Sequence, residues 1–394
     1  MRGNRDLALV VCGAAVSLFG TAVTIIVLLL HVKGFGAFAV VGVLIAEFVP
    51  VSVFAPLAGL LVDRVPNRRL IVIGQLVQGC AALALTAVLH SLALILITLV
   101  VLGCGTAVVN PAASAMVPVI CGEDGSARGY SWLGVGRSAG MLAGSAAGGL
   151  LVAGLGTREA LFVDAGTYFA QAALLSLVRA ERDPRGAPRE KDGAASAGLR
   201  LLAADPVLRV ATVCLAVSCT GVMFADVATV FYVTDVLGGG AGTLGLLHAC
   251  WLLGVLAGAR AAARLVRQRA LLLGLGSACA AMGMAMLLPA ALPFTGAVAL
   301  GYVVGGAATG MQNVTNLGIV RARSPAHLRG RAFAAAGAVL VGSNVLGTVL
   351  GGAVVAGLGP RGAFALAALA TVLAGASALL ALRAVETTKA APVA

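Results

Sequence analysis

Four ionisable residues stand inside long apolar stretches of the sequence, where a charge is costly and therefore points to function. Glu47 and Asp226 lie deep in their stretches, and a carboxyl in such a place can take up and release a proton when its surroundings change. Asp164 and Arg137 complete the set of proton-coupling candidates. The alternative is that these groups are structural. We favour that role for Asp164, with Arg158 or a helix end as its partner, whereas Arg137 is expected to reach the membrane surface or pair with a carboxylate.

Uncharged polar side chains in the same stretches are the candidates for a substrate cavity. Gln312 and Asn316 are four residues apart and therefore share one helix face. These side chains either line a substrate path or hydrogen-bond between helices. The expected remainder of the lining is Ala, Val, Leu, Phe and Met, which favours an amphipathic or apolar organic substrate. The candidates are Ser17, Thr21, Thr24, Asn110, Gln312, Asn313 and Asn316.

The sequence offers no pattern for an enzyme, a metal site or an ATP-driven pump. It has four histidines and no set of nucleophile, histidine and acid at a recognisable spacing. Its eight cysteines are scattered through apolar stretches without a C-x-x-C pair, which indicates neither zinc nor a disulfide framework. No G-x-x-x-x-G-K-[ST] loop occurs, so this chain does not use ATP for transport. We expect no catalytic residues, cofactor or metal.

The composition requires that the helices positioning these residues lie in a membrane. Of the 394 residues, 60% are hydrophobic and 11% charged, and the mean hydropathy is +1.04. Soluble domains are about 45–50% apolar and about 25% charged. The 53 glycines, with abundant alanine, suit closely packed membrane helices. Codon bias is the other explanation for this richness in small residues.

Twelve windows of about 20 mostly apolar residues are long enough to span a bilayer. A polar stretch at 179–200 divides them into six and six. This pattern predicts an all-α membrane protein of two six-helix bundles, at 1–178 and 209–383. Between them we expect a linker at 179–208 with an interfacial helix at 197–208, and a tail at 384–394. The windows are 7–30, 39–62, 70–89, 92–117, 132–155, 160–178, 210–234, 243–265, 270–289, 291–318, 333–358 and 362–382.

The basic residues predict the orientation of the chain. Of the 27 lysines and arginines, all but Lys33, Arg158, Arg361 and the intramembrane Arg137 fall on one side of the twelve windows. The positive-inside rule makes that side cytoplasmic, with both termini, in a bacterial inner membrane. The net charge of +12 then faces anionic lipid headgroups, not nucleic acid, because the charges are interspersed between spans.

The two halves of the sequence align at an offset of 203 residues. Chance matches are frequent in sequence rich in alanine and glycine, but the polar matches are harder to explain in that way. A duplicated six-span unit is a known transporter plan, with its two copies related by an axis along the membrane normal. The aligned pairs include Asn110 with Asn313, Arg128 with Arg331, Arg158 with Arg361 and Gly144 with Gly347.

The segment at 59–69, in the short turn after the second window, resembles motif A of the major facilitator superfamily. Its matching residues are Gly59, Asp63, Arg64, Arg68 and Arg69, although Pro66 and Asn67 displace the usual glycine. The resemblance implies a latch between Asp63 and the start of the eleventh span near Arg331. Such a latch would hold the outward-open state and break in the inward-open state, since a helix N-terminus attracts an anion.

Three further segments resemble the macrolide-efflux and siderophore-exporter branch of that superfamily, at 162–169, 201–209 and 324–332. A fourth resembles antiporter motif C, with Ser145 in place of its proline. The arginine of motif B is missing, because Leu99 stands there. The glycines of the motif C resemblance, which imply close helix packing, are Gly140, Gly144, Gly148 and Gly149.

The function expected from these features is proton-coupled efflux of an amphipathic drug or secondary metabolite by alternating access. A carrier for one siderophore or other metabolite is the alternative. A membrane receptor or scaffold that does not transport is a third hypothesis. The expected partners are the lipid bilayer, a small organic substrate and protons, without nucleic acid, and the expected state is a monomer.

Overall fold

The computed structural model describes residues 2–180, 194–265, 268–325 and 328–390, and helices make up nearly all of them. Within these ranges no strand occurs. The chain divides into two compact units, which are described separately. Unit 1 contains Met1–Arg189 and Gly239–Ala249, and unit 2 contains Glu190–Gly238 and Cys250–Ala394. The all-helical membrane fold predicted from the apolar windows is confirmed.

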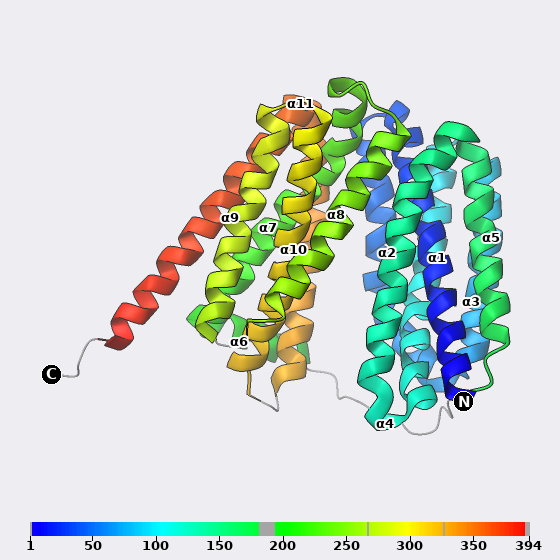
Figure 1. Ribbon diagram of the computed structural model, residues 1–394, viewed down its shortest axis with the longest axis horizontal. Coiled ribbons are helices and arrows are strands. Elements are labelled where there is room, and N and C mark those ends of the chain that lie inside the picture. Colours follow the sequence, from blue (N-terminus) through cyan, green and yellow to red (C-terminus); the bar gives the residue numbers. More distant parts are fainter. Residues whose placement is uncertain (1, 181–193, 266–267, 326–327, 391–394) are drawn as a thin grey trace. The chain divides into compact units, whose positions relative to one another are not determined.

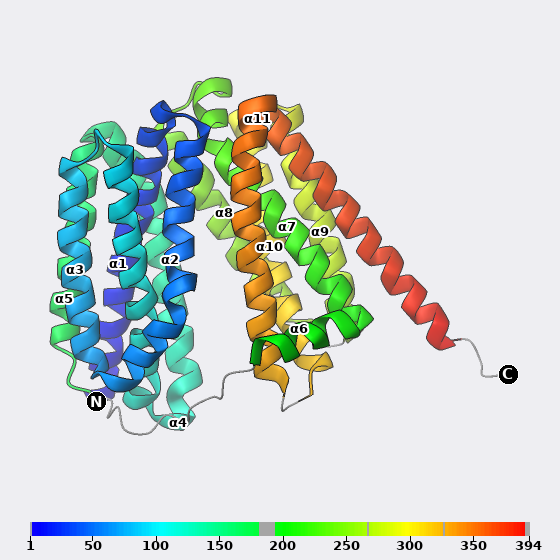
Figure 2. The same ribbon diagram turned by 180° about the vertical axis from the view of Figure 1, so that it is seen from behind.

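Unit 1 is built from long helices that Figures 1 and 2 show side by side from two directions. The longest, α4, joins two helices at Gly122, whose φ of 73° is outside the helical range. Glycine tolerates this conformation because it has no Cβ. One element therefore contains two predicted spans. The elements are α1 (Arg2–Val32), η1 (Lys33–Phe35), α2 (Ala37–Arg64), α3 (Asn67–Ala87), α4 (Leu92–Gly154) and α5 (Thr157–Ser176).

Unit 2 repeats this plan and adds a short helix before it. Its longest helix, α11, also joins two helices at a glycine, Gly359, with φ of 72°. The first half of α8 belongs to unit 1 and the second half to unit 2. The elements are α6 (Ala194–Ala204), α7 (Pro206–Phe231), the π-turn η2 (Tyr232–Val236), α8 (Ala241–Ala262), α9 (Gln268–Ala291), α10 (Thr295–Arg323) and α11 (Arg329–Ala390).

Eight segments of the described chain are long and apolar enough to cross a membrane by length and composition. One of them, Arg329–Ser377, contains most of the last two predicted windows. The kinked helices α4 and α11 thus account for two windows each, and α1, α2, α3, α5, α7, α8, α9 and α10 account for the other eight.

The short helix α6 lies across the ends of the long helices of its unit and packs against α7 and α11 (Figure 2). Its Leu202 is buried in a cluster with Leu208, Leu275 and Ile319. The helix expected at 197–208 differs in extent, because Asp205 ends it and starts α7. Residues 181–193 of the predicted linker lie outside the described residues. The segment predicted as a tail continues α11 as helix to Ala390.

Glycines bring α1 and the second helix of α4 into backbone contact. A Cβ on Gly140 would collide with the carbonyl of Ala15, and one on Gly144 would collide with the carbonyl of Phe19. Gly148 continues the row beside Val23. Successive contacts are four residues apart in both helices, so the row of glycines on α4 packs along one face of α1. Small residues permit this approach where van der Waals packing must hold helices together.

The same contact recurs in unit 2 between α7 and α11. There Gly347 packs on Thr220 and Gly351 packs on Phe224. These glycines are the partners of Gly144 and Gly148 in the repeat at an offset of 203. The internal repeat of the sequence therefore corresponds to a repeated helix contact.

Candidate functional site

A buried carboxyl group joins α1 to α5 inside unit 1. Asp164 is 0% exposed, and Thr24 Oγ1 donates to its Oδ2 at 2.5 Å. Thr167 Oγ1 donates to the Asp164 carbonyl at 2.7 Å and lies 3.3 Å from Oδ1. Gly20 makes room for this group, since a Cβ there would collide with Asp164 Oδ1. The prediction that Asp164 pairs with Arg158 is wrong, because its partners are these two hydroxyls.

Arg158 has a different neighbour in the same helix. Its guanidinium carbon lies 5.8 Å from the centroid of the Phe162 ring, within the range of a cation–π contact. Asp164 is also in the interior of α5, so it does not cap a helix end. Its role in unit 1 is to accept hydrogen bonds between α1 and α5.

Tyr168 extends this polar cluster toward α2. Its hydroxyl lies 3.5 Å from Thr21 Oγ1, and Thr21 donates to the Ser17 carbonyl at 3.1 Å. Glu47 on α2 is close enough to Tyr168 for their charges to interact. Unit 1 thus places two of the proton-coupling candidates, Glu47 and Asp164, near two of the substrate-cavity candidates, Thr21 and Thr24.

Arg137 bridges the two helices of α4. Its Nη2 lies 3.4 Å from both the Asn110 carbonyl and Ser114 Oγ. In the described part of the chain, this guanidinium thus contacts two neutral oxygens. The sequence had predicted that it reaches the membrane surface or pairs with a carboxylate. The side chain of Asn110 itself is exposed.

A small cavity beside Asp226 lies inside unit 2. Its volume of about 20 Å³ is enough for one group of the size of a water molecule. The cavity is bordered by α7, α8, α9, α10 and the second helix of α11, and Asp226 carries the only charge among its lining residues. The side chains that define its chemistry are Asp226, Trp251, Met282, Met286, Tyr302 and Phe364.

Two aromatic pairs form walls of this cavity or lie next to it. The rings of Trp251 and Tyr302 meet edge to face, with centroids 6.0 Å apart. Phe364 packs in the same way on Tyr232, at 5.3 Å, and the Tyr232 hydroxyl donates to the Pro289 carbonyl at 2.6 Å. Trp251 and Tyr302 were not among the residues predicted from the sequence. Their scarcity was the available signal, since the chain has two tryptophans and four tyrosines.

Gln312 and Asn316 are both buried, as a shared helix face predicts, whereas Asn313 is exposed. The Gln312 amide exchanges hydrogen bonds with Ser218: Ser218 Oγ donates to Oε1 at 3.1 Å, and Nε2 donates back at 2.9 Å. Gln312 does not line the cavity beside Asp226. This pair joins α10 to α7 within the bundle.

The residues that resemble motif A take different roles in unit 1. Arg68 donates to the Ser176 carbonyl at the last turn of α5, whereas Arg64, Arg69 and Asp63 are exposed. A Cβ on Gly59 would meet open space. Arg331 belongs to unit 2, so the latch between Asp63 and Arg331 stays a prediction.

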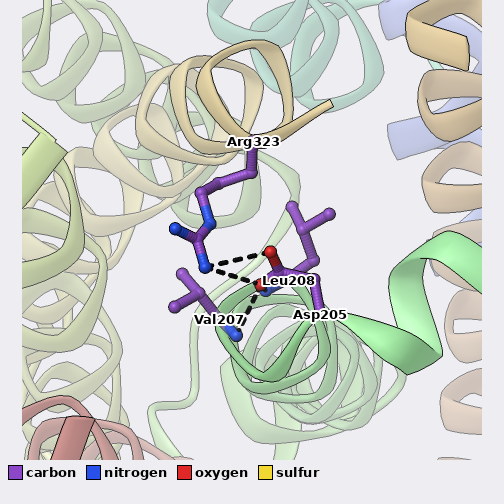
Figure 3. Close-up of polar contacts among 4 residues, drawn as sticks. All are labelled: Asp205, Val207, Leu208 and Arg323. Atoms are coloured by element: carbon purple, nitrogen blue, oxygen red, sulfur yellow. Dashed lines mark hydrogen bonds and ion pairs between the residues drawn. The ribbon is translucent and has the colours of Figure 1, made fainter. Parts of the chain in front are cut away.

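The start of α7 is held by a capping carboxylate, shown in Figure 3. Asp205 Oδ1 accepts from the backbone amides of Val207 at 2.8 Å and Leu208 at 3.1 Å, which are unpaired donors of the first turn. Arg323 Nη2 lies 2.9 Å from Asp205 Oδ2. Burial raises the pKa of Asp205, but the Leu208 amide and Arg323 outweigh it and hold the pKa below its usual value.

Comparisons with known proteins identify the family of the chain. The family model described as the Major Facilitator Superfamily matches residues 9–300. A search of curated proteins gave no match. In the part of the chain that the structure describes, no group of three or more His, Cys, Asp or Glu residues could hold a metal ion.

Solved transporter structures share the fold. The nucleoside transporter NupG is similar with a TM-score of 0.74 at 11% identity, over 96% of this chain and 99% of that one. The POT family transporter PepTSo has a TM-score of 0.76 at 12% identity, over 97% and 98%. A bacterial homologue of the human lysosomal transporter Spinster has 0.72 at 15% identity, over 96% of each chain. At these identities the similarity concerns the fold alone.

Proposed function

Because the chain belongs to the Major Facilitator Superfamily, we propose that it is a proton-coupled exporter of an amphipathic organic compound that works by alternating access. It is a multi-pass membrane protein, and the proposed orientation places both termini in the cytoplasm, on the basic side of the spans. Protons moving inward would supply the energy for export, since the chain carries no nucleotide-binding loop.

The cavity beside Asp226 is the observation that carries this proposal. A carrier driven by protons needs a group in the membrane interior that binds a proton in one state and loses it in another. Among the described residues no hydrogen-bond donor reaches the Asp226 carboxylate, and the cavity has room for a proton-carrying partner. Asp164 differs, because Thr24 and Thr167 already occupy its oxygens.

The proposed roles follow from this difference. Asp226 and Glu47 are each proposed to bind and release a coupling proton. Asp164 is proposed to hold α1 against α5. Ser17, Asn110 and Asn313 are proposed to contact substrate, because their side chains are at least partly exposed and no hydrogen bond between their side chains and other described residues is seen. The apolar surroundings suit an amphipathic compound better than a sugar.

The test begins with expression in an efflux-deficient host and a screen of a broad compound panel for altered accumulation. A compound that responds is then used with proteoliposomes that contain a pH-sensitive dye, so that proton and substrate movements are measured together. Glu47→Gln and Asp226→Asn are each expected to lose proton-driven transport. Asp124→Asn, which changes an exposed carboxyl of α4, is the matched control and should transport normally.

Full proton-driven transport by both the Glu47→Gln and Asp226→Asn variants would contradict the coupling proposal. A response to one compound class alone would favour the carrier specific for a single metabolite. Loss of transport in the Asp124→Asn control would show that the assay responds to any loss of negative charge.

A further inference from the structure

We propose that the cavity beside Asp226 binds the protonated amino group of an organic amine. The inference rests on the proposed function only where it identifies this amine as the exported compound. The binding site itself is argued from charge, hydrogen bonding, aromatic contacts and size. Each of these properties comes from described residues of unit 2.

The first argument is the charge of the cavity. Asp226 is its one charged lining residue, and no described donor satisfies the carboxylate. A carboxylate in apolar surroundings needs a counter-charge or a proton, because burial of an isolated charge is strongly unfavourable. An ammonium group supplies the counter-charge and up to three N–H donors at once.

The second argument is the direction of the hydrogen bonds around Tyr302. Thr229 Oγ1 lies 2.5 Å from the Ala225 carbonyl, which uses the single proton of this hydroxyl. Thr229 and Tyr302 are also hydrogen-bonded, so Tyr302 must donate to Thr229. The phenolic oxygen therefore keeps its lone pairs for a donor in the cavity, and it is close enough to Asp226 for their charges to interact. Carboxylate and phenol together form an acceptor pair that suits N–H groups.

The third argument is the aromatic wall. Trp251 is the best cation–π partner among the side chains, and Tyr302 meets it edge to face at 6.0 Å. Gly305 allows the Trp251 ring to lie there, because a Cβ on Gly305 would be 2.8 Å from Trp251 Cζ3. The indole N–H of Trp251 is a hydrogen-bond donor, whereas the other side chains of the lining are acceptors or apolar. This wall favours a cation over a neutral or anionic group.

The fourth argument is size. A volume of about 20 Å³ holds one group of the dimensions of a water molecule, which is also the size of an ammonium head. Met282 and Met286 complete the lining with flexible, polarisable side chains that adapt to an attached alkyl carbon. The cavity therefore fits the head of an amphipathic amine, while the rest of the molecule must extend out of it.

The experiment uses Trp251 as its own reporter. The chain has two tryptophans, so Trp132→Phe leaves Trp251 as the sole tryptophan of the purified full chain. Its fluorescence is followed during titration with n-butylamine at neutral pH, where the amine is protonated, and with n-butanol as the neutral match. We expect a saturable change with the amine and at least a tenfold weaker response to the alcohol.

Substitutions in this Trp132→Phe background identify the residues responsible. Asp226→Asn should weaken amine binding at least tenfold, and Tyr302→Phe should weaken it several-fold while keeping the aromatic ring. Asp124→Asn is the control that should bind as the parent does. Because Asp226→Asn could fail to fold, its melting temperature is measured first, and Tyr302→Phe decides the matter if the asparagine variant is unfolded. Equal responses to amine and alcohol, or unchanged binding in Asp226→Asn, would overturn the proposal.

Transport separates this inference from the proposed function. Amine binding together with proton-driven export of that amine supports both. Proton-driven export of another compound without amine binding overturns the inference and leaves the proposed function intact. Amine binding without any proton-driven transport supports the site and contradicts the exporter.

Discussion

Asp205 pairs with Arg323 across unit 2 and thereby ties the start of α7 to the end of α10. The guanidinium Nη2 lies 2.9 Å from Oδ2 of the carboxylate, while Oδ1 accepts from the amides of Val207 and Leu208 (Figure 3). One side chain therefore caps a helix and forms an ion pair. α6 ends at the residue before it, so the pair also marks the junction of the added helix with the bundle.

Removal of this carboxylate should destabilise the protein more than removal of the arginine. An N-cap contributes about 1 kcal/mol, and a partly exposed ion pair contributes up to about 1 kcal/mol. We therefore expect Asp205→Ala to lower the free energy of unfolding by about 2 kcal/mol and Arg323→Gln by less than about 1 kcal/mol. Thermal unfolding in detergent measures both. Equal losses would mean that the cap contributes nothing.

The Asp205 carboxylate should also make stability depend on pH in acid. Although burial acts in the opposite direction, the Leu208 amide and Arg323 leave its folded pKa below the unfolded value of about 3.9. Its contribution is therefore complete above that value and is lost as the pH falls through the folded pKa. The difference in melting temperature between the wild type and Asp205→Asn should be constant from about pH 7 to 5 and shrink below about pH 4. A difference that grows on acidification would refute this assignment.

The row of glycines in α4 should tolerate no side chain where it meets α1. Gly144→Ala places a Cβ against the Phe19 carbonyl, so the helices must separate. We expect this to lower the free energy of unfolding by about 1–3 kcal/mol. Gly134→Ala in the same helix meets nothing within 4 Å and should be neutral or stabilising by up to about 1 kcal/mol. Melting temperatures of the two variants give the comparison. Similar behaviour would show that the α1–α4 contact adapts to added volume.

Adjacent arginines of the motif A segment should differ in their contribution to stability. Arg68 donates to the Ser176 carbonyl, one of the orphan acceptors at the end of α5, whereas Arg69 is exposed. We expect Arg68→Gln to lower stability by about 1–3 kcal/mol and Arg69→Gln by no more than about 0.5 kcal/mol. Unfolding in detergent distinguishes them, and a larger loss for Arg69→Gln would overturn the assignment.

The hydroxyl of Thr24 should contribute more to stability than the shape of its side chain. Thr24→Val keeps the volume but leaves the buried Asp164 Oδ2 without its donor, which costs about 1–3 kcal/mol. Thr24→Ser keeps the donor and should lose less. Melting temperatures again provide the measurement. A valine variant as stable as the wild type would mean that Asp164 is satisfied without Thr24.

The membrane fold and its repeat could be predicted because both depend on properties that are local in sequence. A span must be apolar over about 20 residues, so every helix that crosses the membrane is visible as a window. The missed features are also instructive. The kinks at Gly122 and Gly359 depend on single backbone angles, and their glycines are two among 53.

The candidate site was only partly predictable, because its contacts link distant parts of the chain. Asp226 and Asp164 could be singled out from their charge in an apolar stretch. The sequence suggested Arg158, six residues away, as a partner for Asp164, whereas the donor is Thr24, which is 140 residues away. Trp251 and Tyr302 approach Asp226 from two other helices, and helix periodicity does not specify which faces of different helices meet.

The amino-acid sequence by itself determined that this chain enters a membrane, which stretches are apolar enough to span it, and which few charges lie within those stretches. These follow from the transfer of each residue between water and lipid, which depends on residue type alone. The tertiary structure decided that Asp164 is enclosed by hydroxyls and that Asp226 faces a cavity with Trp251 and Tyr302. That difference depends on how helices pack, because the surroundings of a carboxyl, and not its position in the chain, determine what it can bind.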